Sequence, residues 1–306
     1  MNSYNRYNNI SNNNYNTSCL DIKQISCEIE KFGYKKQAER LENCCKNKVY
    51  FKCNCRIYVL PARCMNKVCP KCSKIRSYKI FKEYFEVLKE YKIGHSIYDN
   101  NCLRFLTLTI KNRKSLEEAI NFLYKSFRKF KQRVYFKNHI FGGIGVMDYT
   151  KDENGLWHVH LHLIINSNYL AREYKGHDPK LVQEWKTCTN ETGILYINLV
   201  KNHKGGLNYV LKYISKVAKN ISSKDLAVFY KSTKNRRFLF TFGTMYKVTK
   251  KTKFVCKKCD CCLEYAPYLE GLLKSKNVDD SFTGVLDILT CKPPPLEIQS
   301  SLAKYG

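Results

Sequence analysis

The segment most informative about the fold runs from residue 140 to residue 166. It reads IFGGIGVMDYT (140–150), KDENG (151–155) and LWHVHLHLIIN (156–166). The two outer segments are largely apolar, while the short middle segment is polar and ends in glycine. Two apolar runs joined by such a turn are typical of an antiparallel hairpin. We therefore expect this hairpin to form the centre of the fold.

Three histidines alternate along the second arm of the hairpin. His158, His160 and His162 are spaced two residues apart, so an extended strand places all three imidazoles on one face. The chain has 7 histidines in 306 residues, and three of them fall within five positions. This pattern favours a metal site over the alternative, a chance grouping on a surface strand.

An acidic residue on the first arm completes a possible ligand set. If KDENG is the loop, Asp148 pairs with His158 and Val146 pairs with His160, which puts Asp148 on the histidine face and diagonal to His160. Two imidazoles and one carboxylate suit Mg²⁺ or Mn²⁺ bound to a phosphate. A register slip of one residue would remove Asp148 from that face.

The segments around the hairpin predict an α+β fold. In chain order we expect a strand (103–110), a helix capped by Ser115, the hairpin, a short helix (179–186), a strand (193–200), a helix (205–220) and an edge strand (236–243). This order suits an antiparallel sheet with helices packed on one face, preceded by a small zinc-binding module.

The helix at 205–220 carries two tyrosines one turn apart. Tyr209, Tyr213 and Lys216 lie at i, i+4 and i+7, and with Lys212 they make two overlapping Tyr-x-x-Lys units. A nearby ammonium group stabilises phenolate and phosphate, as a tyrosine that attacks a phosphodiester requires. The alternative is chance, because the chain has 23 tyrosines and is very basic.

The charge balance points to a polyanionic partner. Lys and Arg number 54 against 26 Asp and Glu, giving a formal net charge of +28. Such a surplus favours nucleic acid as the partner. We find neither a run of about 18 apolar residues nor an apolar signal core near the start, so we expect a cytoplasmic protein with no membrane partner.

Cysteines gather in two groups, at 44–72 and at 256–262. In a chain without an export signal, clustered thiols favour metal over disulfides. Cys69 and Cys72, at C-x-x-C spacing before a helix, predict a zinc knuckle. The completing pair must come from Cys53, Cys55 and Cys64; we expect Cys55 and Cys64, with Cys53 as the alternative.

The second group lies within seven residues and comprises Cys256, Cys259, Cys261 and Cys262. Four ligands so close together leave little chain to wrap a tetrahedral ion. These residues either hold a second zinc or complete the first site. For the first group, the alternative is a set of scattered buried thiols without metal.

Three motifs, in this order, resemble the HUH endonucleases, and among them the rolling-circle replication initiators of plasmids and phages. They are FLTLT (105–109), WHVHLHLII (157–165) and NYVLKYISK (208–216), and the resemblance covers about residues 50–243. MDYT (147–150) matches the place where the initiators have an acidic residue, an apolar residue and Thr.

The resemblance implies roles for individual residues. His160 and His162 fall on the metal-binding pair, and Asp148 stands where many relatives have Glu as the third ligand. His158 is an additional histidine without a ligand position. Tyr209 and Tyr213 resemble the two-tyrosine subgroup, although single-tyrosine initiators also carry Lys-Tyr-x-x-Lys.

A cysteine-rich segment before the nuclease motifs extends the resemblance. RCMNKVCPKCSKIRS (63–77) is similar to a segment that precedes the nuclease domain in several initiators and related transposases. We therefore expect a disordered leader (1–18), a helix and zinc module (19–92), a nuclease domain (100–245) and a C-terminal segment with the second cysteine group and a tail (246–306).

The expected activity follows from the resemblance. The chain is expected to nick single-stranded or locally melted origin DNA, form a 5′-phosphotyrosine link and leave a free 3′-OH for a host polymerase, with a host helicase as a further partner. A single-strand transposase of the same chemistry is the nearest alternative. A non-enzymatic, zinc-containing regulator that binds DNA or RNA is the alternative from another class.

Overall fold

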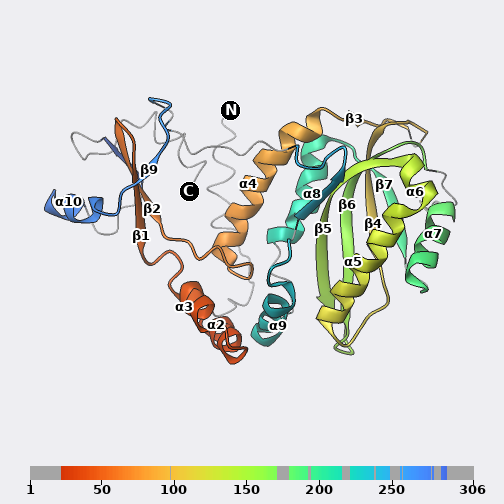
Figure 1. Cartoon of the computed structure of the whole chain (residues 1–306), viewed down its shortest axis with the longest axis horizontal. Helices are drawn as coiled ribbons and strands as arrows, with labels where there is room; N and C mark the ends of the chain where they lie inside the picture. The colour runs from red at the N-terminus through yellow and green to blue at the C-terminus, as the bar shows by residue number, and fades with distance from the viewer. Residues whose placement is uncertain are drawn as a thin grey trace.

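The computed structural model describes residues 22–287, apart from 97, 171–178, 192–193, 216–220, 238, 249–255, 257, 277 and 279–283. In this part of the chain, a large sheet with helices on both faces lies beside a smaller sheet, and the long helix α4 (Pro70–Lys89) lies between the two (Figure 1). The predicted leader at 1–18 lies outside the described residues.

The larger sheet is built around the predicted hairpin. Its strand order is β3 (Lys92–Ile93), β4 (Cys102–Thr109), β6 (Trp157–Ser167), β5 (Ile140–Lys151) and β8 (Leu239–Gly243), with β7 (Leu195–Leu199) also paired to β4. Apart from the short parallel pair β3–β4, the described strands of this sheet pair antiparallel. The α+β class with an antiparallel sheet is confirmed.

The register of the hairpin differs by two residues from the prediction. Asp148 pairs with His160, not with His158, because Lys151 pairs with Trp157 and the loop begins only at Asp152. The Asp152 carboxylate accepts a hydrogen bond from the Leu156 N–H at 2.8 Å, and Gly155 takes the left-handed conformation that closes the turn. A shift of two residues keeps every side chain on its predicted face.

Helices cover both faces of the larger sheet, whereas the sequence predicted one. On one face lie α5 (Leu116–Gln132), α6 (Val134–His139) and α7 (Pro179–Thr189). The opposite face carries α8 (His203–Ser215) and, outside it, α4 (Figure 1). The reason is that the central strands are apolar on both sides: Leu161 of β6 packs under α5, and Ile164 packs under α8.

The face under α8 changes character along its length. At one end it is apolar, with Val146 and Ile164 in the core beneath α8. At the other end it carries polar side chains that share the same face, among them Asp148, His160 and His162. The candidate site therefore lies where the apolar cover of the sheet ends.

Segments from both ends of the chain form the smaller sheet. Its order is β10 (Gly284–Asp287), β2 (Arg56–Pro61), β1 (Lys48–Lys52) and β9 (Glu264–Tyr265), all antiparallel. The short helix α10 (Leu269–Ser275) packs on it. The segments predicted as separate modules at 19–92 and 246–306 thus share one sheet; the domain boundaries themselves stay a prediction.

The remaining described helices attach the N-terminal segment to the larger domain. α2 (Ile22–Lys31) and α3 (Lys35–Glu42) contribute Ile25, Ile29 and Leu41 to the same core as α5, and α9 (Ser223–Thr233) adds Phe229. Among the described helices, none combines the length and the apolar composition needed to cross a bilayer.

Candidate functional site

Asp148, His160 and His162 come together on the open end of the sheet. One ligand atom from each lies within 4.8 Å of those of the other two. The His160 Nε2 atom is 3.1 Å from Asp148 Oδ2, and the His162 Nε2 atom is 4.0 Å from the same oxygen. Asp148 and His162 are buried, while the His160 side chain keeps 15% of its surface accessible. Such a convergent set could hold a divalent cation.

Thr107 on the neighbouring strand contacts the second histidine. It pairs directly with His162 in the β4–β6 register, and its hydroxyl oxygen lies 3.2 Å from His162 Nδ1. With Nδ1 engaged in this way, Nε2 is the nitrogen that faces Asp148. A hydrogen bond to the far nitrogen of a metal-binding imidazole sets the tautomer and the ring orientation. Thr107 is therefore placed to orient His162.

Helix α8 brings a tyrosine to the same site. The Tyr209 ring lies edge-on to the His162 ring, with 5.9 Å between centroids, and packs against Phe105. Its side chain is 37% exposed. Lys212 Nζ lies 3.9 Å from the centroid of the Tyr209 ring, a cation–π contact that adds positive charge next to the site.

The other predicted groups of this motif are only partly described. Tyr213 is one turn beyond Tyr209 on α8, but its side chain lies outside the described part, as does all of Lys216. His158 extends the histidine row, with 4.9 Å between its ring centroid and that of His160. Burial and the neighbouring His160 lower the pKa of His158.

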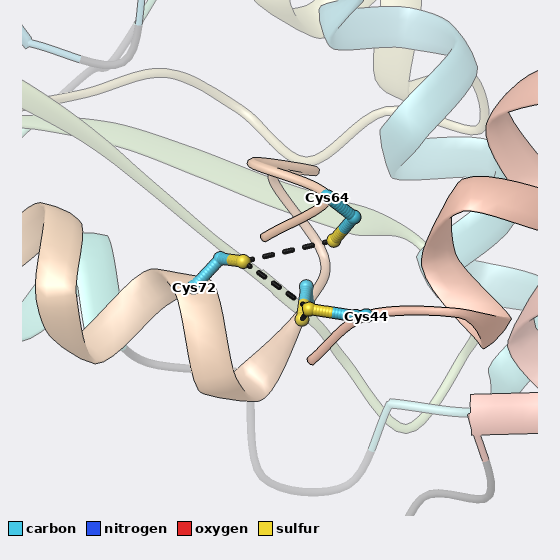
Figure 2. Close-up of side chains that lie close together, drawn as sticks. Cys44, Cys64 and Cys72 are labelled. Carbon is cyan, nitrogen blue, oxygen red and sulfur yellow. Dashed lines mark hydrogen bonds between the residues drawn. The ribbon is translucent and has the colours of Figure 1, made fainter. Parts of the chain in front are cut away.

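The first cysteine cluster differs from the predicted set in one member. Its four sulfur atoms belong to Cys44, Cys64, Cys69 and Cys72, all buried and all within 4.8 Å of one another. Cys55, predicted here, lies in the other cluster. The reason is that the chain after α3 passes next to the first turn of α4, which brings Cys44 to Cys72 (Figure 2).

The sulfur separations in this cluster match a tetrahedral zinc site. Cys44 and Cys72 are 3.5 Å apart, and Cys64 and Cys72 are 3.6 Å apart (Figure 2). Zn–S bonds of about 2.3 Å in a tetrahedron place sulfur atoms about 3.8 Å from each other. The hydrogen bond from Cys64 lowers the pKa of Cys69 to about 5, against the effect of burial. The cluster could therefore hold zinc.

The cysteine cluster lies at the beginning of the helix that supports α8. Pro70 starts α4 directly after Cys69, and Cys72 lies in its first turn. Further along α4, the Ser77 hydroxyl donates to the Leu211 carbonyl oxygen of α8 at 3.1 Å. The cysteine cluster is thus connected through α4 to α8, the helix that carries the predicted tyrosines.

The second cysteine cluster also differs from the predicted set. Cys256 and Cys259 meet Cys53 and Cys55 of the hairpin β1–β2, with all ligand atoms within 4.8 Å. Cys261 and Cys262, predicted as ligands, are not part of this group. The turn from Cys256 to Cys261 brings the sulfur atoms of Cys256 and Cys259 to those of Cys53 and Cys55, while Cys261 Sγ accepts a hydrogen bond from the Asn54 side-chain amide at 3.5 Å.

Sequence reasoning missed Cys44 and Thr107. Cys44 has no regular spacing to Cys64 or Cys69, so no local pattern could distinguish it from the adjacent Cys45. Thr107 had a usable signal: it alternates with apolar residues within FLTLT, and on a central strand such a side chain shares a sheet face with the residue directly opposite on the paired strand.

Comparison with known proteins gives the chain its family. Residues 58–267, well over half of the chain, match a family described as "Replication protein". The chain belongs to this replication protein family. The matched range contains the Asp148, His160 and His162 cluster and the described part of α8.

A curated relative agrees with this assignment. A protein of Streptococcus pneumoniae serotype 2 named "Protein rep" is 25% identical, over 61% of this chain and 62% of its own length. The chain thus spans less than two-thirds of the length of that relative. No solved structure matches the chain.

Proposed function

We propose that the chain is a rolling-circle replication initiator that nicks one strand of its origin DNA at a specific site. Membership of the replication protein family supports a role in starting replication. The observation that carries the chemistry is the convergence of Asp148, His160 and His162 beside Tyr209. Transposition shares this chemistry, but the family match favours replication.

The Asp148, His160 and His162 cluster would place a divalent cation at the scissile phosphate. These three residues would hold Mg²⁺ or Mn²⁺, and Thr107 would keep the His162 ring in its binding orientation. When bound, the ion supplies Lewis-acid stabilisation of the charge that develops on the phosphate. The partial exposure of His160 leaves the open side of the cluster to the DNA backbone.

A tyrosine of α8 supplies the nucleophile. The phenol loses its proton, its oxygen forms a bond to phosphorus, and the bond from phosphorus to the 3′ oxygen breaks. The products are a 5′-phosphotyrosine and, after protonation, a free 3′-OH that primes a host polymerase. We assign the first attack to Tyr213, because Lys212, Tyr213 and Lys216 match the Lys-Tyr-x-x-Lys context of the single-tyrosine initiators, and strand transfer at termination to Tyr209.

The DNA substrate is single-stranded or locally melted at the site. The net charge of +28 supports tight, salt-dependent binding to phosphates. Tyr209 next to Lys212 provides a ring and a cation of the kind that stack on unpaired bases. Host helicase would then extend the melted region.

A nicking assay tests the proposal. Purified protein is incubated with Mn²⁺ and supercoiled DNA that carries the region upstream of its own gene. We expect open-circular DNA with protein attached to the 5′ end. Binding without any nicking would instead support a regulator. Undiminished nicking in EDTA would contradict the role of the metal.

A further inference from the structure

The second cysteine cluster joins two segments of chain that are about 200 residues apart. We propose that Cys53, Cys55, Cys256 and Cys259 bind one zinc ion, which clamps the hairpin β1–β2 to the segment that follows the larger sheet. This proposal is independent of the nicking chemistry, since the cluster lies in the smaller sheet.

The sulfur geometry supports the site. Cys53 and Cys55 Sγ are 3.7 Å apart, and Cys55 and Cys256 Sγ are 3.6 Å apart. These separations are close to the edge of about 3.8 Å expected for a zinc tetrathiolate tetrahedron. They also match the separations in the first cluster, so both clusters have ligand spacing suited to the same ion.

The turn after Cys256 has the hydrogen bonds of a zinc knuckle. The backbone N–H of Lys258, two residues on, donates to Cys256 Sγ at 3.4 Å. The first cluster repeats this contact, since the N–H of Asn66 donates to Cys64 Sγ at the same distance. A backbone N–H aimed at sulfur stabilises a thiolate, the form that binds metal.

The smaller sheet has a small apolar core, so a bound zinc ion would add to its stability. Its apolar core consists of a few side chains, and two of its four strands, β9 and β10, are only two and four residues long. Small units with little buried apolar surface commonly depend on disulfides or metals for stability. Cys53 and Cys256 pack against Tyr58 of β2 and Val285 of β10.

The test measures zinc in the full-length chain and in serine variants. We expect about two zinc ions per wild-type chain and about one in Cys53→Ser or Cys256→Ser. The double variant should also retain about one, because both residues bind the same ion. Cys262→Ser, an exposed cysteine outside the cluster, is the matched control and should keep about two.

Two results would overturn the proposal. One is a Cys256→Ser protein that keeps the full wild-type zinc content; the other is loss of zinc from Cys262→Ser but not from Cys53→Ser. The first result would remove the proposed site, and the second would assign the ligands to the C-terminal cysteines alone.

A second measurement needs no variant and so does not depend on the variants folding. Native protein is alkylated and the modified cysteines are mapped by mass spectrometry, with and without a strong chelator. We expect the four cluster cysteines to be protected until the chelator is added, while the exposed Cys27 and Cys262 react at once. Reaction of Cys53 and Cys256 as fast as Cys262 in the untreated protein would contradict a bound ion.

Discussion

The cluster of Cys44, Cys64, Cys69 and Cys72 lies at the first turn of α4, and the cluster of Asp148, His160 and His162 lies on the sheet beside α8; the two differ in how accessible their ligands are. The first offers four buried thiols, which complete a tetrahedron and leave no position for a substrate. The second offers three ligands on a partly accessible face with a tyrosine beside it. A site whose protein ligands fill the coordination sphere stabilises the fold, whereas a site with an open coordination position can bind a substrate.

Loss of a ligand from the Asp148, His160 and His162 cluster should reduce the rate of nicking most strongly. His160→Ala should lower the rate of nicking about a thousandfold, equivalent to roughly 4 kcal/mol of transition-state stabilisation. Retention of DNA should change little, because the basic surface supplies binding. Nicking kinetics and a gel-shift assay on the same preparation measure both. His158→Ala is the matched control and should be milder; an equal loss in both variants would assign His158 to the ligands.

Loss of a ligand from the cysteine cluster at the start of α4 should lower the stability of the fold. Cys44→Ser should lower the free energy of unfolding by at least about 3 kcal/mol, because zinc-binding energy is also folding energy. Thermal unfolding and zinc content measure the effect. The adjacent Cys45, outside the cluster, gives the matched control Cys45→Ser. If the two variants lost the same stability, the assignment of Cys44 to a metal site would be wrong.

The two tyrosines of α8 can be distinguished by removing one hydroxyl at a time. Tyr213→Phe keeps the ring and removes the hydroxyl, so it should abolish the adduct at Tyr213 and slow the first cleavage at least about a hundredfold. Tyr209→Phe should leave first cleavage and impair strand transfer. Peptide mapping of the protein–DNA adduct distinguishes them: DNA on Tyr209 alone reverses the assignment, and DNA on neither removes the two-tyrosine mechanism.

A smaller change is expected when the Thr107 contact to His162 is removed. Thr107→Val removes the hydroxyl that contacts His162 Nδ1 and should weaken Mn²⁺ affinity about 10- to 100-fold. Nicking at saturating Mn²⁺ should recover most of the wild-type rate, which a merely misfolded variant would not do. Thr107→Ser retains a hydroxyl and should bind Mn²⁺ nearly as the wild type does. Equal affinities in Val and Ser variants would contradict the role.

The face of the hairpin that carries the candidate metal ligands could be predicted because it depends on local periodicity. Alternation in a strand places His160 and His162 on one face whatever the rest of the chain does. Asp148 lies on the predicted face, although its predicted cross-strand partner was wrong. The register error was two residues, and side chains along a strand return to the same face every two residues. Helices on both faces of the sheet were missed, since short apolar runs do not reveal which side is covered.

The sequence alone determined the hairpin, the alternation of its histidines, the capped helix after Ser115 and the tyrosine spacing on α8, since each depends on residues within a few positions of one another. Which cysteines come together depends on the tertiary packing. The sulfur atoms of Cys44 and Cys72, and those of Cys55 and Cys256, come close together because segments far apart in the chain pack against each other. Thiols carry no directional pattern along a sequence, so their partners follow from how helices and strands pack and not from spacing.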